Sequence, residues 1–141
     1  MAEEQFGTAD TYFRAFEILR REGIPEKHIA ILQAHFEAPR HTATWAQLAE
    51  VVGYANGNAV NLQYGTLAGR AARLLGLLEP PEGWWLFVLV DWAKKKGPRG
   101  HQAFVLRRPV IEALARLGVL PESHERQQGT AADVSASRPR R

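Results

Sequence analysis

HTATWAQLAEVVGYANGNAVNLQYGTLAGRAARLL, residues 41–75, is the stretch that decides the fold of this chain. It predicts two helices joined by a tight turn. The first helix begins at about Thr44, which forms a capping-box pair with Gln47, and it ends near Val52, where Gly53 enters the left-handed region most easily. Spacings of three and four residues give it one apolar stripe, made of Trp45, Leu48, Val51 and Val52.

The second helix follows the turn at residues 54–57, and Asn58 is predicted to cap it. Its apolar side consists of Val60, Tyr64, Leu67, Ala71, Leu74 and Leu75. Its other side presents Asn58, Asn61, Gly65, Thr66, Gly69 and Arg73, with Gln63 and Arg70 at the boundary. Amides, hydroxyls and guanidinium groups read base edges and phosphates, which indicates a recognition helix for a DNA major groove. An amphipathic helix with an ordinary solvated face is the alternative.

Gly65 and Gly69 are unusual inside a helix, where each costs about 1 kcal/mol relative to alanine. A DNA backbone that comes close to the helix would explain them. In the alternatives, the helix is an ordinary amphipathic helix with a kink at Gly65, or the two glycines admit a partner helix.

Two helices are predicted before this pair. Thr8 or Asp10 caps the first, which runs to about Arg21 and stops at Gly23. Its apolar face is Tyr12, Phe13, Phe16, Ile18 and Leu19. The next begins at Ile24-Pro25 and ends at Pro39, with Ile29, Leu32 and Phe36 inward. Its histidines, His28 and His35, are too few for a metal site, so we expect them to be exposed or partly packed and expect no cofactor.

After residue 83 the helical spacing of apolar residues gives way to a run of aromatic and branched residues, which predicts the strands of a hairpin. Trp84–Ala93 is apolar on both faces, as in a strand covered on both sides, and His101–Leu106 is the second strand. The loop between them carries Lys94, Lys95, Lys96 and Arg99. These residues favour phosphate contacts, although lysines also protect sheet edges from pairing. Arg108-Pro109 begins a last helix that ends at Gly118.

This order of elements predicts an α+β, mostly helical fold: a winged helix-turn-helix with a two-stranded hairpin wing. We expect a flexible arm at residues 1–7, the winged helix domain at residues 8–121 and a disordered tail at residues 122–141, where large apolar residues are scarce. Winged helices also pair through terminal helices, here residues 8–21, so a homodimer is one expected partner state.

Composition limits the function classes. The 141 residues carry a net charge of +3, which permits a nucleic-acid partner, and they include no cysteine, which excludes disulfides and thiolate chemistry. The polar N-terminus is not a signal peptide, and the longest apolar run, Trp84–Val90, is too short to span a bilayer. We expect a cytoplasmic, nucleoid-associated protein without a membrane partner.

The segments TATWAQLAEVVGYANGNAVNLQYGTLAGR, WWLFVLVDW and FVLRRPVIEALARLGVL resemble a small helix-turn-helix domain of bacterial HNH endonucleases. That domain precedes the catalytic part in modification-dependent restriction enzymes of the McrA type. The similarity covers roughly residues 26–121 and rests on residues 47–49, 53–54, 61–65 and 108–109. This sequence carries no HNH catalytic segment. The resemblance therefore implies a double-stranded DNA-binding module of a restriction-modification system, without the nuclease, that recognises modified cytosine.

Residues 42–68 are also similar to the DNA-binding half of O6-alkylguanine alkyltransferases. The alkyl-accepting cysteine is absent, which excludes alkyl transfer but leaves base flipping open. The aromatic candidates for stacking on a flipped base are Tyr54, Tyr64, Trp45 and Trp84, with Tyr54 first because it lies in the turn. Core packing is the alternative role for all four.

The sequence favours no enzyme. Asp91 is the only carboxylate in the predicted hairpin strands, and serine occurs only in the tail, at residues 123, 135 and 137. We therefore predict double-stranded DNA binding, with a non-enzymatic protein-interaction module as the alternative. The candidate DNA-binding residues are Tyr54, Asn56, Asn58, Asn61, Gln63, Thr66, Arg70, Arg73, Lys94, Lys95, Lys96 and Arg99.

Overall fold

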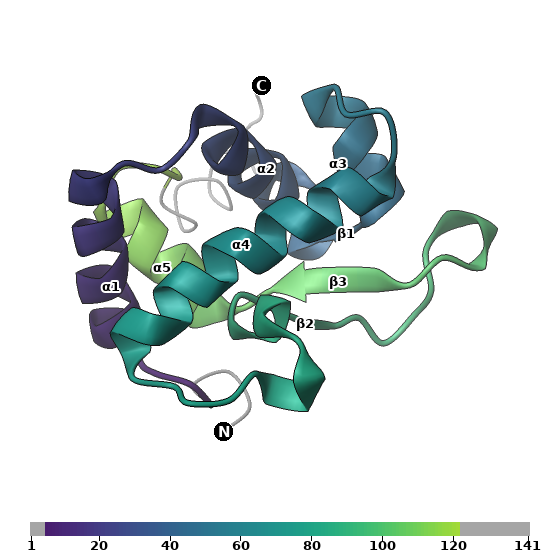
Figure 1. The fold of residues 1–141 in the computed structure, drawn as a ribbon. Helices are drawn as coiled ribbons and strands as arrows, with labels where there is room; N and C mark the ends of the chain where they lie inside the picture. Colours follow the sequence, from purple (N-terminus) through teal and green to yellow (C-terminus); the bar gives the residue numbers. More distant parts are fainter. Residues whose placement is uncertain (1–4, 122–141) are drawn as a thin grey trace.

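A computed structural model describes residues 5–121, and the tail predicted at residues 122–141 lies outside the described residues. Figure 1 shows an α+β, mostly helical arrangement with a small antiparallel sheet, which confirms the α+β, mostly helical class that the sequence predicted. The elements in chain order are α1 (Ala9–Glu22), α2 (Glu26–Glu37), η2 (Pro39–His41), β1 (Thr42–Thr44), α3 (Trp45–Val52), α4 (Gly57–Leu75), η3 (Pro81–Gly83), η4 (Trp85–Val88), β2 (Val90–Trp92), η5 (Pro98–Gly100), β3 (Ala103–Leu106) and α5 (Arg108–Arg116), where η denotes a 3-10 helix.

The first helix begins where the sequence predicted, since Thr8 is its N-cap. The loose arm predicted at residues 1–7 is wrong in part, because Phe6 packs against the core and lies under the guanidinium of Arg107, 5.0 Å from it. Residues 1–4 lie outside the described range.

The sheet has three strands instead of the predicted two. Its order is β1-β3-β2, and both pairings are antiparallel: Thr42 is opposite Val105, and Val90 is opposite Leu106. The missed strand, β1, is only three residues long and directly precedes α3. A segment this short has no measurable period, and its partner lies about sixty residues away in the sequence.

The strand predicted at Trp84–Ala93 is wrong over most of its length. Trp85–Val88 form η4, and only Val90–Trp92 pair with β3. The carbonyl of Val88 accepts a hydrogen bond from the Tyr12 hydroxyl of α1, at 2.6 Å, instead of a bond from a strand. A short run that is apolar on every side is buried in either conformation, so its pattern does not distinguish them. The second strand likewise begins at Ala103 and not at His101.

The predicted helix pair is confirmed in its first member. Thr44 Oγ1 accepts from the Gln47 N–H at 3.1 Å, and the Gln47 side chain accepts from the Thr44 N–H at 2.9 Å. Gly53 is left-handed, with φ at 97°. In the second member the predicted cap, Asn58, is wrong. Asn56 is the cap, and its Oδ1 accepts from the Asn58 N–H at 3.0 Å.

Close packing explains why α4 begins so early. A Cβ atom at Gly57 would lie 2.9 Å from the Trp45 Cβ and 3.1 Å from the Ala46 backbone nitrogen. Only glycine therefore lets the first turn of α4 rest on the first turn of α3. Within α4, four of the predicted core residues are buried, namely Val60, Tyr64, Leu67 and Ala71. Two core predictions are wrong: Leu74 is 41% exposed and Val51, on α3, is 72% exposed.

The glycines of α4 give a matched test of this packing. Gly57→Ala is expected to destabilise the protein, because its Cβ meets backbone and side-chain atoms of α3. Gly65→Ala adds a Cβ that has no neighbour within 4 Å, so it is expected to stabilise the helix by up to about 1 kcal/mol. Urea unfolding of both variants measures the two shifts. A Gly57→Ala variant as stable as the wild type would contradict the close helix contact.

Candidate nucleic-acid interface

A buried histidine fixes α4 in place. His35 of α2 is fully buried, with its Nδ1 2.7 Å from the Tyr64 hydroxyl of α4 and its Nε2 2.9 Å from the Phe104 carbonyl of β3. A carbonyl only accepts, so Nε2 carries the proton and the Tyr64 hydroxyl donates to Nδ1. Burial lowers the pKa of His35 to about 4 and raises the pKa of Tyr64. The prediction that His35 is exposed or partly packed is wrong, because its two nitrogens join three elements.

Aromatic rings reinforce this junction. Trp45 stacks on Phe104, with ring centroids 4.1 Å apart and planes 10° apart, and its centroid lies 5.4 Å from that of Tyr64. The ring centroid of Trp92 lies 5.4 Å from that of Phe104. Tyr64 and Trp45, two candidates for stacking on a flipped base, are therefore packed between α3, α4 and β3.

The other two aromatic candidates differ in their surroundings. Tyr54 packs partly against the core, and the Lys27 ammonium lies 5.0 Å from the centroid of its ring. One position over that ring is thus already held by a cation of α2. Trp84 is 60% exposed.

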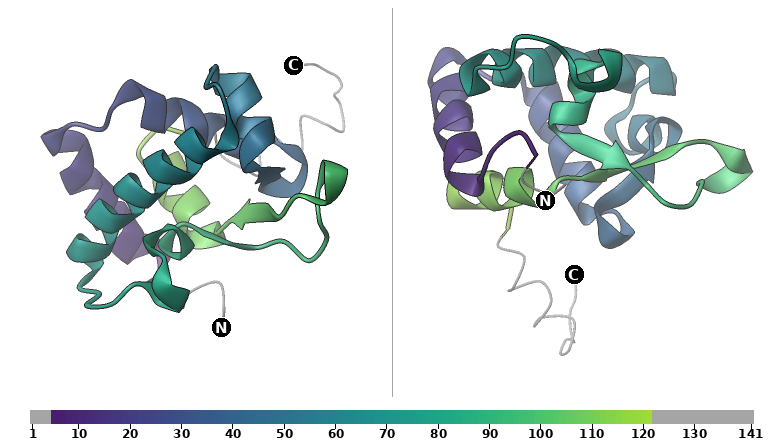
Figure 2. Two further views of the ribbon diagram at one scale, coloured as in Figure 1. Left: turned by 45° about the vertical axis from the view of Figure 1, so that its right-hand side comes forward. Right: turned by 90° about the horizontal axis from the view of Figure 1, so that it is seen from below.

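The loop between β2 and β3 contacts the amino-terminal end of α3, which in turn packs against the amino-terminal end of α4. A Cβ atom at Gly97 would lie 2.5 Å from the Thr44 Cγ2, so the loop touches the residue that caps α3. Gly57, the first residue of α4, packs on the next residue, Trp45. In Figures 1 and 2 this loop projects beyond the helices, at the end of the molecule opposite α1.

This loop carries unneutralised positive charge. Lys94, Lys95, Lys96 and Arg99 are all exposed, and within residues 5–121 none of them forms an ion pair with a carboxylate. Helix N-termini add partial positive charge to the same end of the molecule. The combined field attracts an anion as extended as a phosphate backbone.

The outer face of α4 retains only part of the predicted polar set. Asn58, Thr66 and Arg73 are exposed and Asn61 is half-buried. Leu62, which is not among the predicted contact residues, shares this face and is 68% exposed. Its spacing of four residues from both Asn58 and Thr66 was a signal that could have placed it there.

Two predicted contact residues instead hold α4 against its neighbours. Gln63 Oε1 accepts from the His28 ring of α2, whose Nε2 lies 2.5 Å away. His28 is buried, contrary to the prediction. Arg70 Nη2 lies 3.5 Å from Glu22 Oε1 of α1. Gln63 and Arg70 therefore form the border of the exposed face towards α1 and α2.

The two glycines of α4 also differ. A Cβ atom at Gly69 would lie 3.6 Å from Trp85 Cδ1, so the chain itself covers that position. Space beside Gly65 is open. A close approach from outside is thus available at Gly65 and not at Gly69.

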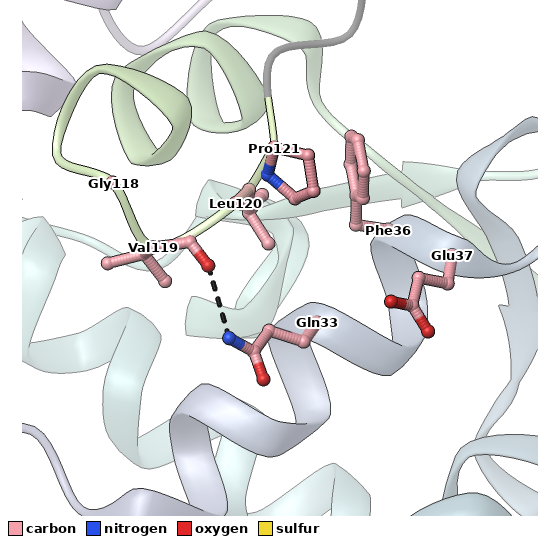
Figure 3. A pocket seen from close by; sticks show the side chains of 7 residues that line it. All are labelled: Gln33, Phe36, Glu37, Gly118, Val119, Leu120 and Pro121. Atoms are coloured by element: carbon pink, nitrogen blue, oxygen red, sulfur yellow. Dashed lines mark hydrogen bonds between the residues drawn. The ribbon is translucent and has the colours of Figure 1, made fainter. Parts of the chain in front are cut away.

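Within residues 5–121 no three His, Asp or Glu side chains are grouped so that they could hold a metal ion. Asp91, the carboxylate of the hairpin, lies 3.8 Å from Arg107. The hollow drawn in Figure 3, about 450 Å³, is open and lies between α2 and residues 118–121, where Gln33 donates to the Val119 carbonyl at 3.1 Å. No helix within this range has both the length and the apolarity to cross a membrane.

Comparison with protein-family models, with curated proteins and with solved structures finds no significant match to this chain.

The buried His35 predicts a pH dependence of stability. Its pKa is lower in the folded protein than its ordinary value of 6.5, so the unfolded chain binds more protons between pH 6.5 and about 4. The contribution is complete above pH 6.5 and is lost as the pH falls. We expect the free energy of unfolding to drop by on the order of 2 kcal/mol between pH 7.5 and 5 because of this residue.

Urea unfolding of the wild type and His35→Gln at both pH values tests this. Glutamine keeps a donor and an acceptor but does not titrate, so the variant should be less stable at pH 7.5 and should lose less stability on acidification. Equal losses in the two proteins would contradict the assignment.

Proposed function

We propose that this protein binds double-stranded DNA as a winged helix, with α4 in the major groove and the β2–β3 loop on flanking phosphates. The observation that carries the proposal is the basic loop of residues 94–99, which forms no ion pair with a carboxylate within residues 5–121 and contacts Thr44 at the start of α3, where the first turn of α4 also packs. Contacts to base edges require amide and hydroxyl groups, and contacts to the flanking phosphates require cationic groups on an adjacent surface.

The topology supports this arrangement. A helix pair joined by a short turn is followed by an antiparallel hairpin, and β1 ties the start of that pair to the hairpin through β3. The junction of His35 with Tyr64 and Phe104 sets α4 relative to β3. The helix α4 and the β2–β3 loop would then bind DNA as one rigid unit, which reduces the conformational entropy lost on binding.

The roles of individual residues follow from their accessibility. Asn58, Asn61, Thr66 and Arg73 would contact the groove or its walls, and the basic loop would contact phosphates. Gln63, Arg70 and Tyr54 would act by holding α4 and its turn in place, because each already has an internal contact. Asn56 caps α4 through its carbonyl oxygen, which leaves its amide N–H groups for a phosphate.

The resemblance to restriction endonuclease domains extends the proposal to modified cytosine as a target and to a nucleoid-associated, non-enzymatic role in bacterial restriction-modification. A cytosine-methylated duplex, compared with the same unmodified duplex, tests that extension directly.

A protein-interaction module remains the second candidate, favoured by the open position at Gly65 and by the exposed Trp84 and Leu78, which are 60% and 94% exposed. Salt separates the two functions. Phosphate binding weakens steeply as salt rises, whereas an apolar interface is nearly insensitive to salt.

Fluorescence anisotropy with a labelled duplex, unmodified and cytosine-methylated, between 50 and 200 mM salt tests the DNA-binding surface. The triple variant Lys94→Ala/Lys95→Ala/Lys96→Ala should bind more weakly, and the slope of log affinity against log salt should fall by about 0.9 for each phosphate contact removed. Arg73→Ala should also weaken binding while leaving the fold intact, because Arg73 is exposed.

The matched control is Arg14→Ala/Arg21→Ala on α1, at the far end of the molecule (Figure 1). It removes positive charge without touching the loop, so its salt slope should equal that of the wild type. An equal loss of affinity in the control and the loop variant would indicate a general effect of net charge and would overturn the surface assignment.

A further inference from the structure

The exposed face of α4 is not uniformly polar. Asn58, Leu62 and Thr66 are four residues apart and therefore lie one above another on the same side. Leu62 is 68% exposed at the centre of this row, so no side chain within residues 5–121 covers it and a bound molecule can contact it.

The neighbours of Leu62 make the centre of the face more apolar than its sequence indicates. The Thr66 hydroxyl donates to the Leu62 carbonyl at 3.0 Å, so its proton is used within the helix. Gly65 contributes no side chain, and the space beside it is open. An amide at Asn58 thus lies next to an apolar centre that another molecule can approach closely.

This combination has a counterpart in the major groove. The pyrimidine C5-methyl is the one apolar group exposed there, and it lies beside the hydrogen-bonding edges that an asparagine reads, such as adenine N6 and N7. Residues four apart on a helix are separated by about 5–6 Å, which spans one to two base steps.

Resting on the proposed function, we propose that Leu62 is a specificity-determining residue that contacts a pyrimidine C5-methyl group in the major groove, next to a base read by Asn58. Thymine and 5-methylcytosine present the same methyl group. The protein would therefore prefer duplexes that carry a methyl at this position over duplexes that lack it.

The test starts from duplexes that the wild-type protein selects from a random pool made with thymine and 5-methylcytosine. Each selected duplex is then prepared in four forms: with both methyls, with uracil in place of thymine, with cytosine in place of 5-methylcytosine, and with both replacements. These replacements remove methyl groups and keep every base-pairing group. We expect a loss of roughly fourfold in affinity for each contacted methyl.

For Leu62→Ala, removal of the methyl groups should no longer lower the affinity. The variant should bind the methyl-free duplex with the affinity and the salt slope of the wild type. The matched control is Val51→Ala, since Val51 is an equally exposed apolar residue of α3, at 72%. It should retain the full methyl preference. If affinity falls when uracil replaces thymine, the contacted methyl belongs to thymine. If it falls when cytosine replaces 5-methylcytosine, the methyl belongs to 5-methylcytosine.

Two results overturn the inference and leave the proposed function standing: salt-steep binding that ignores both methyls, and a methyl preference that persists in Leu62→Ala. Absence of binding to any duplex at low salt would overturn the proposed function as well. Circular dichroism of both variants confirms that each remains folded.

Discussion

The structure depends on one buried imidazole. His35 accepts from the Tyr64 hydroxyl and donates to the Phe104 carbonyl, and it thereby joins α2, α4 and β3 at a point with no access to water. An unpaired polar group at this depth would cost about 1–3 kcal/mol, so the three partners must stay in register. The stacked rings of Trp45 and Phe104 close the junction from the side of α3. A long helix and a strand from distant parts of the sequence are thus held in one relative position.

Glycines then bring the charged loop to that junction. Gly57 lets α4 touch the first turn of α3, and Gly97 lets the β2–β3 loop touch Thr44, which caps the same turn. The lysines at residues 94–96 are a weak signal when taken alone, because lysines are common at hairpin tips. Their position at the start of α3, against which the first turn of α4 packs, is the stronger argument, and it arises from contacts between distant segments that the sequence does not reveal.

The sequence predicted the helices well where capping and periodicity agree. Thr44 with Gln47, Gly53, and the apolar series from Val60 to Ala71 each specify a local structure that the tertiary contacts also favour. The prediction from sequence failed where contacts between distant segments determine the local conformation. Residues 85–88 are apolar on every side and become a 3-10 helix under α4, and β1 exists only because β3 pairs with it. His35 and His28 were misjudged because their partners, Tyr64 and Gln63, lie about thirty residues away. The candidate site was predicted as a set of residue types, whereas the separation of Gln63 and Arg70 from the free face required the structure.

The central claim is that one continuous surface, made of the amino-terminal half of α4 and the β2–β3 loop, contacts duplex DNA. Backbone amide chemical-shift mapping tests it most directly, with an unlabelled duplex titrated into the ¹⁵N-labelled protein at low salt. We expect perturbations to concentrate at residues 56–66 and 94–100, with a further perturbation at Arg73. The amides of α1 should stay unchanged, except for small effects at Glu22, whose carboxylate lies 3.5 Å from the Arg70 guanidinium. Perturbations centred on α1 and α5, or none at all, would contradict it.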